Sequence, residues 1–189
     1  LQLLLGLSIL LQFNAFTVAL GVSSLLLIVL YPFMKRITYW PQLFLGFTFN
    51  WGALLGWAAV KGELSAPAFV LYGAGIFWTL GYDTIYAHQD KEDDVLIGVK
   101  STALKFGDGT KPWLVGFYSI TVILLAATGL LANLAWPFYS GLTLAALHLA
   151  WQIKSVDIAN SKNCLRRFKS NRDFGLILLA GIIAAQVIG

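Results

Sequence analysis

The chain has 189 residues, of which 58% are hydrophobic and only 12% are charged, and its mean hydropathy is +0.75. An average soluble domain carries about 25% charged residues, so this composition excludes an ordinary soluble domain and indicates a membrane protein. The formal net charge of +4 does not indicate nucleic-acid binding, because the basic residues flank the ends of hydrophobic segments.

Seven hydrophobic segments follow one another along the chain. A membrane span needs about 20 residues, so two longer uncharged stretches must each be divided, one at Asn14 and one between Asn133 and the Trp136-Pro137 pair. Most segments lack the polar face of a soluble helix, and the first and last are shorter than a bilayer requires. We therefore predict an all-α, multi-span membrane helical bundle with segments at residues 1–13, 15–33, 37–60, 64–82, 112–132, 137–153 and 174–189.

The basic residues predict the topology. Threading the segments alternately across a membrane places every Lys and Arg except Lys61 on one side, as the positive-inside rule requires. The basic stretch 162–172 on that side is expected to contact anionic lipid head groups. Within the segments, Gly52 and Gly56 form a small-xxx-small pair that predicts close helix packing, and His148 is expected to be a packed or hydrogen-bonded helix residue.

An acidic cluster lies on the same inner side, in the segment 82–94. If one helix ran through it, Asp83, Asp90 and Asp94 would line one stripe, with Asp93 off to the side. Asp90 and Asp94 would lie about 5–6 Å apart and together bind one hard cation. Asp83, about 10 Å back along the axis, would need a kink, a second ion or a water to join them. Because like charges repel and a helix C-terminus is already negative, the cluster predicts a divalent cation such as Mg²⁺.

Other polar residues surround the cluster. Tyr31 and Lys35 share a helix face and present a hydroxyl and an ammonium group, although an interfacial belt would use the same residue types. Lys91 and Lys100 bracket the acidic residues and would either neutralise them or hold an anion. His88 is expected to be a polar surface residue, and Gly107-Asp108-Gly109 to form a turn.

These features together indicate chemistry on a lipid diphosphate. Mg²⁺ prefers a few carboxylates plus substrate phosphates to an all-protein cage. An ion bound in that way neutralises charge on a departing diphosphate, and an apolar bundle keeps water away from the carbocation that remains. A divalent-cation transporter would also carry carboxylates on membrane helices, but near mid-membrane or in a ring rather than at one surface.

Several motifs resemble those of one family, the intramembrane aromatic prenyltransferases of the UbiA superfamily. The chain is similar to that family in its second aspartate-rich motif, in the stretch that follows this motif and in a Tyr-xxx-Lys motif; the matching residues are Asp83-xxx-Tyr86-Ala87-xx-Asp90-xxx-Asp94, Gly98-Val99-Lys100-Ser101-Thr102-Ala103 and Tyr31-xxx-Lys35. Further stretches, Tyr39-Trp40-Pro41-Gln42 and Asn50-Trp51-Gly52-Ala53 among them, resemble the branch that prenylates 4-hydroxybenzoate in ubiquinone biosynthesis, in its animal mitochondrial form.

This resemblance implies a nine-helix bundle that transfers a polyprenyl group from polyprenyl diphosphate to the ring of 4-hydroxybenzoate. It implies Mg²⁺ bound by Asp83, Asp90 and Asp94, with Tyr31 and Lys35 contacting substrate. From their place on either side of the acidic cluster, we also expect Lys91 and Lys100 to contact substrate. The resemblance also implies a mitochondrial inner membrane protein with its motif loops facing the matrix, with membrane lipid and a coenzyme Q biosynthetic complex as its expected partners.

Residues 1–189 are expected to form a single prenyltransferase domain that lacks the first two helices and the first aspartate-rich motif, so we expect this chain alone to be inactive. Sister prenyltransferases of the menaquinone and haem O pathways are the alternatives within the family, and a non-catalytic scaffold subunit is an alternative outside catalysis.

Overall fold

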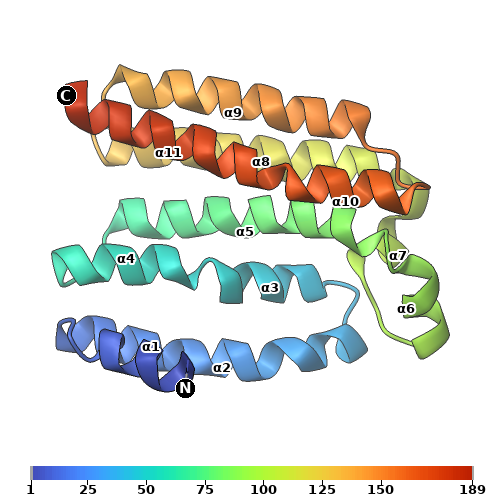
Figure 1. Cartoon of the computed structure of the whole chain (residues 1–189), viewed down its shortest axis with the longest axis horizontal. Helices are drawn as coiled ribbons and strands as arrows, with labels where there is room; N and C mark the ends of the chain where they lie inside the picture. The colour runs from blue at the N-terminus through green and yellow to red at the C-terminus, as the bar shows by residue number, and fades with distance from the viewer. Residues whose placement is uncertain (1, 189) are drawn as a thin grey trace.

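The computed structural model describes residues 2–188, and within that range every regular element is a helix. The prediction of an all-α bundle is therefore confirmed. Figure 1 shows the long helices lying side by side in layers, with α5 between the α3–α4 pair and the group of α8, α9 and α11. In chain order the helices are α1 (Gln2–Leu10), α2 (Ala15–Ile37), α3 (Pro41–Phe49), α4 (Trp51–Lys61), α5 (Ala66–Ala87), α6 (Lys91–Ile97), α7 (Thr102–Phe106), the 3-10 turn η1 (Gly107–Gly109), α8 (Thr110–Leu131), α9 (Trp136–Ser155), α10 (Ser161–Lys169) and α11 (Asn171–Ile188).

Both predicted helix breaks are confirmed. Asn14 is the N-cap of α2, where its Oδ1 accepts a hydrogen bond from the Thr17 amide at 2.9 Å and its Nδ2 donates to the Ala58 carbonyl of α4 at 2.9 Å. The second break contains Asn133, which has a positive φ of 53°, and α9 then begins at Trp136 with Pro137 in its first turn. Each break has a local cause, since asparagine and proline both favour helix starts over helix interiors.

The segment predicted at 37–60 is divided in the structure. It forms α3 and α4, which meet at Asn50. The Asn50 side-chain amide donates to the Gly46 carbonyl at 2.9 Å and to Thr79 Oγ1 of α5 at 2.8 Å. A side chain that competes for backbone carbonyls in this way interrupts the helix, and its bond to α5 stabilises the break.

Four stretches of the described residues are long and apolar enough to cross a membrane. They are Ala15–Ile37, Pro41–Lys61, Thr102–Leu131 and Ser161–Ile188. The chain therefore has the membrane character that its composition predicts, with fewer qualifying spans than the seven segments. Helix α5 has 22 residues and α9 has 20, but neither is among these four stretches, and α1 has only nine residues.

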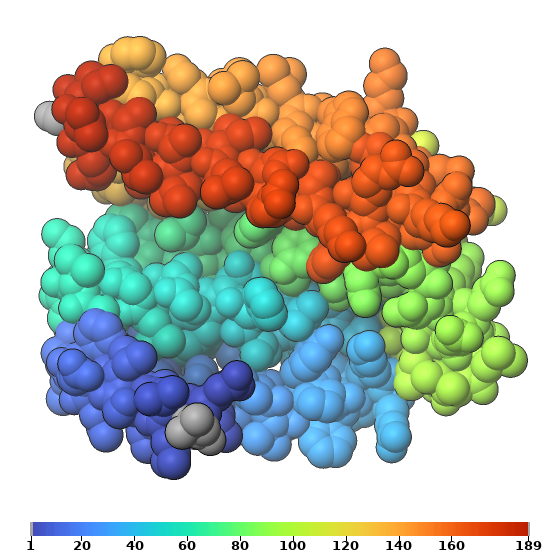
Figure 2. Space-filling model, in the orientation of Figure 1, coloured from blue at the N-terminus to red at the C-terminus, as the bar shows by residue number. Residues whose placement is uncertain are grey.

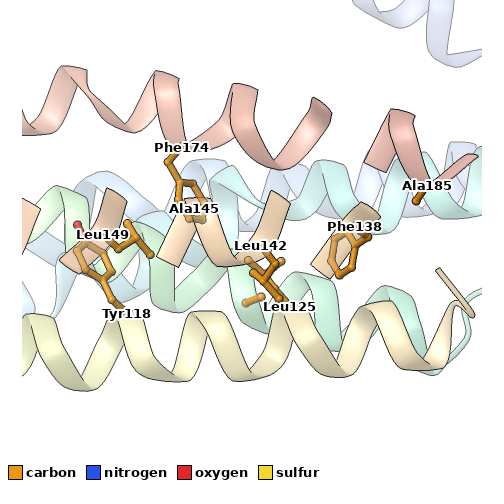
Figure 3. Close-up of a cluster of buried hydrophobic side chains, with 9 residues drawn as sticks. Tyr118, Leu125, Phe138, Leu142, Ala145, Leu149, Phe174 and Ala185 are labelled. Atoms are coloured by element: carbon orange, nitrogen blue, oxygen red, sulfur yellow. The ribbon is translucent and has the colours of Figure 1, made fainter. Parts of the chain in front are cut away.

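The largest core cluster joins α8, α9 and α11. Figure 3 shows Tyr118 of α8 beside Leu149 of α9 and Leu125 of α8 beside Leu142 of α9, with Phe174 of α11 next to Ala145 of α9. Elsewhere in this group, the α9 and α11 backbones come so close that a Cβ added to Gly141 would lie 2.8 Å from the Gly181 Cα. The sequence-based prediction of close packing at Gly52 and Gly56 is wrong, because no atom lies within 4 Å of a Cβ added at either position.

One end of the bundle carries three short helices, α6, α7 and α10, and the basic residues other than Lys61. The C-terminus of α2, helices α6 and α7, and helix α10 all lie at this end, whereas the C-terminus of α4, which carries Lys61, lies at the other (Figure 1). In Figure 2, α6 protrudes at this end below α10. The separation of Lys61 from the other basic residues thus agrees with the predicted topology.

Candidate active site

The acidic cluster is built from two helices rather than one. Helix α5 ends at Ala87, α6 begins at Lys91, and Asp90 is the N-cap of α6. The continuous stripe considered from the sequence is therefore absent. Asp93 and Asp94 lie in the first turn of α6, where the positive end of the helix dipole stabilises carboxylates instead of repelling them. The helix dipole thus offsets part of the repulsion between these carboxylates, which the sequence alone led us to expect a cation to offset.

The three predicted metal ligands occupy different surroundings. Asp83 is half-buried near the end of α5, Asp94 is half-buried in α6, and Asp90 is exposed with a side chain that makes no capping hydrogen bond. The Asp94 amide donates to the Asp90 carbonyl at 2.7 Å, so these two residues lie one helical turn apart as predicted. Among residues 2–188, no three His, Cys, Asp or Glu side chains are grouped closely enough to bind a metal by themselves.

Helix α2 brings the predicted tyrosine and lysine to this cluster. The Lys35 ammonium interacts electrostatically with the carboxylates of both Asp83 and Asp94, and Tyr31 interacts with Asp83. Partial burial raises the pKa of Asp94, and this effect is only partly offset by Lys35 and by a hydrogen bond from Ser101. The structure therefore places four predicted site residues from α2, α5 and α6 at one locus.

Lys100 holds the connection after α6 against the end of α2. Gly98 ends α6 with a φ of 71°, which a residue with a Cβ adopts only with strain. The Lys100 amide then donates to the Lys35 carbonyl at 2.7 Å, and its Nζ donates to the Ile37 carbonyl at 3.2 Å while lying 5.4 Å from the Tyr39 ring centroid. Lys100 thus fixes the position of Lys35, and its predicted contact with substrate stays a prediction.

A buried hydrogen-bond chain supports the same connection. The Thr84 hydroxyl of α5 donates to the Leu80 carbonyl at 2.6 Å, so the Thr102 hydroxyl must donate to Thr84 in their 2.7 Å contact. The Thr102 amide in turn donates to Gln42 Oε1 of α3 at 3.0 Å. This chain joins α3, α5 and α7, and it includes Thr84, the residue that follows Asp83 in α5. It could not be predicted from the sequence, because isolated threonines carry no pattern that reveals their partners.

His88 and Lys91 line a cavity of about 410 Å³, together with Glu92, Asp93 and Asp108. None of the three predicted metal ligands lines it. The prediction of a surface histidine is wrong, because His88 is only 6% exposed. Its Nε2 contacts Thr110 Oγ1 at 2.8 Å, and since that hydroxyl donates to the Gly107 carbonyl, Nε2 must carry the proton. Burial lowers the pKa of His88 to about 4, assisted by Lys91 and opposed by Asp108.

An apolar cavity of about 160 Å³ lies deeper in the bundle, between α4, α5, α8 and α11. Its walls include Trp78 and Ala74 of α5, Leu125 of α8 and Phe174 of α11. Asn50, at the break between α3 and α4, contributes to the same lining. The bundle therefore provides a space for hydrocarbon below an end that carries charge.

Comparison with known proteins places this architecture in a family. The model of the UbiA prenyltransferase family matches residues 1–180. Two solved structures share the fold. The apo structure of a UbiA homolog from Aeropyrum pernix K1 has a TM-score of 0.78 and 24% identity, and the match covers 94% of this chain and 67% of that one. A digeranylgeranylglyceryl phosphate synthase has a TM-score of 0.73 and 21% identity, and the match covers 97% of this chain and 66% of that one.

Curated relatives are more similar in sequence. The mitochondrial 4-hydroxybenzoate polyprenyltransferase of Arabidopsis thaliana is 57% identical over 98% of this chain and 46% of its own length. The proteins of the same name from Caenorhabditis elegans and Homo sapiens are 54% and 53% identical, over 97% and 98% of this chain and 52% and 50% of their own lengths. The chain thus spans about half the length of the curated relatives it matches, and it belongs to the UbiA prenyltransferase family.

Proposed function

We propose that this chain forms part of a mitochondrial membrane enzyme that transfers a polyprenyl group from polyprenyl diphosphate to the ring of 4-hydroxybenzoate, a step of ubiquinone biosynthesis. The names and the 53–57% identity of the relatives from three organisms support this activity. The single observation that supports it most directly is the convergence of Tyr31 and Lys35 with Asp83 and Asp94 at one end of an apolar bundle. Placement in the inner membrane, loops toward the matrix, and membership of a coenzyme Q biosynthetic complex remain predictions.

The residues of this locus suit a bound diphosphate. Lys35 is exposed and carries a positive charge between two carboxylates, so it would attract an anion that also satisfies a cation held by those carboxylates. The Tyr31 hydroxyl, one turn before Lys35 on α2, would donate a hydrogen bond to a phosphate oxygen. Lys91 and Lys100 are the other two residues predicted to contact the substrate. Lys100 also holds the Lys35 backbone in place through its amide hydrogen bond.

We propose Mg²⁺ as the cation. Asp90 and Asp94 fit this ion, because they lie one turn apart, they are hard oxygen donors and the Asp90 carboxylate is free of capping contacts. The lack of a three-carboxylate group is compatible with Mg²⁺, since it binds proteins through one or two carboxylates together with substrate phosphates. When bound, the ion would neutralise charge that develops on the departing diphosphate.

The apolar side chains of the bundle would hold the prenyl chain and limit access of water to the allylic cation, whose reaction with the aromatic ring forms the new carbon–carbon bond. Two alternatives are less well supported. A menaquinone or haem O prenyltransferase would use the same diphosphate site, so only the acceptor separates it from this proposal. A cation transporter would place its carboxylates near mid-membrane, whereas Asp90 and Asp94 lie in the short helix α6 at the end of the bundle.

The test uses a chimera in which residues 1–189 replace the matching half of the Arabidopsis thaliana relative. Membranes containing it are supplied with polyprenyl diphosphate, 4-hydroxybenzoate and Mg²⁺, and the prenylated acid is measured by mass spectrometry. We expect product that disappears with a metal chelator and in the Lys35→Met variant, and that persists in Lys162→Gln, a matched loss of charge on exposed α10. A folded chimera that prenylates a naphthoate acceptor but not 4-hydroxybenzoate would reject the proposed acceptor.

A further inference from the structure

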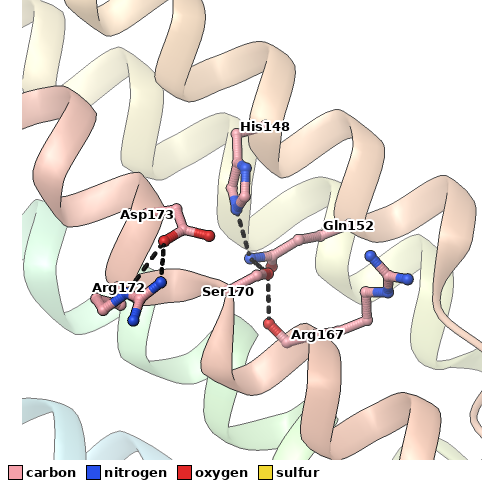
Figure 4. Close-up of polar contacts among 6 residues, drawn as sticks. All are labelled: His148, Gln152, Arg167, Ser170, Arg172 and Asp173. Carbon is pink, nitrogen blue, oxygen red and sulfur yellow. Dashed lines mark hydrogen bonds and ion pairs between the residues drawn. The ribbon is translucent and has the colours of Figure 1, made fainter.

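Arg167 of α10 is a buried charge without a counterion. Its side chain is only 9% exposed, and its Nε and Nη1 atoms are buried without any hydrogen-bond acceptor. Within residues 2–188 a single ion pair forms, between Arg172 and Asp173, and Arg167 takes no part in it. Figure 4 shows the Arg167 side chain reaching from α10 toward α9, with no interaction drawn on its guanidinium group.

The surroundings offset only part of the cost of burying this group. The Arg167 Cζ lies 4.0 Å from the centroid of the Trp151 ring, so a cation–π contact covers one face of the guanidinium plane. The donors of a guanidinium point outward in that plane, however, and a ring below it cannot accept them. Arg167 also lies in the last turn of α10, where the helix dipole favours a cation, but exposed Arg166 and Lys169 provide that benefit without burial. Neither effect explains why the buried donors lack acceptors.

A pocket of about 580 Å³ adjoins this arginine, at the point where α9, α10 and the start of α11 meet. It is strongly basic, because its only carboxylate, Asp173, is already paired with Arg172; the lining residues are Trp151, Arg166, Arg167, Lys169, Ser170, Arg172 and Asp173. Four cationic side chains and one carboxylate give the lining a net charge of +3. Such a pocket favours an anion and disfavours a neutral or cationic ligand.

The backbone that carries Arg167 is held firmly. The Arg167 carbonyl accepts a hydrogen bond from Ser170 Oγ at 2.8 Å (Figure 4). It also accepts one from Asn171 Nδ2 at 3.2 Å. Ser170 Oγ itself accepts from Gln152 Nε2 of α9 at 3.0 Å, and Trp78 Nε1 of α5 donates to Asn171 Oδ1 at 2.9 Å. These bonds fix the α10–α11 junction against two other helices, so the donors of Arg167 are positioned before any ligand arrives.

We propose that this pocket binds a phosphate group, presented by the head group of an anionic phospholipid, with Arg167 as its central ligand. A guanidinium donates two parallel hydrogen bonds to a phosphate, which would satisfy its unpartnered donors. A lipid is the source that fits the location, because the pocket lies where the apolar helix α9 ends and the apolar helix α11 begins, and because the half-exposed Trp151 ring is typical of the membrane interface. The proposal is independent of prenyl transfer, since binding is measured without substrates.

The experiment measures lipid retention by the 189-residue chain purified in neutral detergent. Native mass spectrometry counts bound phosphatidylglycerol, with phosphatidylcholine as the zwitterionic control, and thermal unfolding records the stabilisation that each lipid confers. Inorganic phosphate is added in a separate arm. The variants are Arg167→Gln and Lys162→Gln, which remove equal charge from the same helix; Lys162 is exposed and does not line the pocket.

We expect phosphatidylglycerol to bind and stabilise the parent chain and Lys162→Gln alike, and Arg167→Gln to bind it on the order of 10- to 100-fold more weakly, as the loss of a charged hydrogen-bonding group implies. Equal retention by Arg167→Gln and Lys162→Gln would overturn the proposal, as would equal binding of phosphatidylcholine. Stabilisation by inorganic phosphate without any response to phosphatidylglycerol would overturn the lipid source. If Arg167→Gln unfolds in detergent, Arg167→Lys serves instead, and we expect weakened but measurable binding because lysine keeps the charge and loses the fork.

Discussion

Gln152 offers the sharpest test of how this bundle is held together. Its side chain is fully buried in α9, where Oε1 accepts a hydrogen bond from the Tyr118 hydroxyl of α8 at 2.9 Å. Its Nε2 donates to Ser170 Oγ at 3.0 Å and lies 3.3 Å from His148 Nε2 (Figure 4). The substitution Gln152→Leu keeps a similar volume and removes all of these contacts at once. It therefore changes hydrogen bonding without opening a large cavity.

The magnitude follows from the partners that remain. Tyr118 is only 2% exposed, so its hydroxyl would be buried without an acceptor, which costs about 1–3 kcal/mol. The Ser170 hydroxyl still donates to the Arg167 carbonyl, and it loses only the hydrogen bond that its oxygen accepts from Gln152. An average hydrogen bond between membrane helices contributes about 0.6 kcal/mol. We expect Gln152→Leu to lower the free energy of unfolding by about 2 kcal/mol.

A double-mutant cycle separates this cause from general repacking. Tyr118→Phe alone leaves Gln152 Oε1 without a donor and is expected to cost about 1–2 kcal/mol. Adding it to Gln152→Leu removes the stranded hydroxyl, so the double variant should be more stable than the sum of the single effects predicts, by about 1–2 kcal/mol. Unfolding in mixed micelles, followed by far-UV circular dichroism, measures all four proteins. Additive single effects would refute this account of the Gln152–Tyr118 bond.

Three further expectations concern the site and the packing. In the active chimera, Asp94→Asn should abolish prenyl transfer and Asp93→Asn should reduce it less, because Asp94 interacts with Lys35 whereas Asp93 lines the separate cavity beside His88. Equal losses in the product assay would contradict that assignment. Gly141→Ala should destabilise the chain by about 1–3 kcal/mol, since its Cβ would meet the Gly181 backbone, whereas Gly56→Ala, with open space around it, should be neutral or slightly stabilising in the same unfolding assay. Burial lowers the pKa of His88 to about 4 in the folded state, below its ordinary value of 6.5. The contribution of neutral His88 to the free energy of unfolding is therefore present above pH 6.5 and is lost as the pH falls toward 4, by at most about 3 kcal/mol. With a metal chelator present, His88→Gln should flatten this pH dependence of stability, and an unchanged slope would show that other groups cause it.

Sequence-based predictions are correct where a local signal determines the structure. Asn14 and the Trp136-Pro137 pair marked real helix starts, and the i,i+4 spacing of Asp90 and Asp94 survives in α6. The same reasoning failed where one helix had to be extrapolated past a turn. Periodicity within the segment 82–94 contained no sign that α5 stops at Ala87, because the residues that follow are ordinary helix surface residues.

Long-range contacts could not be predicted from the sequence for a different reason. The proximity of Lys35 to Asp83 depends on how α2 packs against the rest of the bundle, and its assignment to the site came only from family resemblance. Glycine patterns gave one false prediction and missed one real contact. The Gly52–Gly56 pair indicated a helix contact that is absent at these positions, whereas the Gly141–Gly181 contact joins two positions 40 residues apart that share no local motif. Burial of His88 and Arg167 likewise depends on tertiary neighbours that a single sequence does not identify.

Helix α6 has a consequence for dynamics. None of its seven residues is buried, and three successive apolar side chains, Val95, Leu96 and Ile97, are each more than 60% exposed. Few tertiary contacts oppose its local opening, so its backbone amides should exchange with deuterium faster than those of α5, which carries Asp83. Asp90 and Asp94 would then belong to the least protected helix of the site, while Lys35 and Asp83 belong to long helices. If the proposed site binds a diphosphate, we expect α6 to become ordered, and slower amide exchange in this helix alone would report that binding.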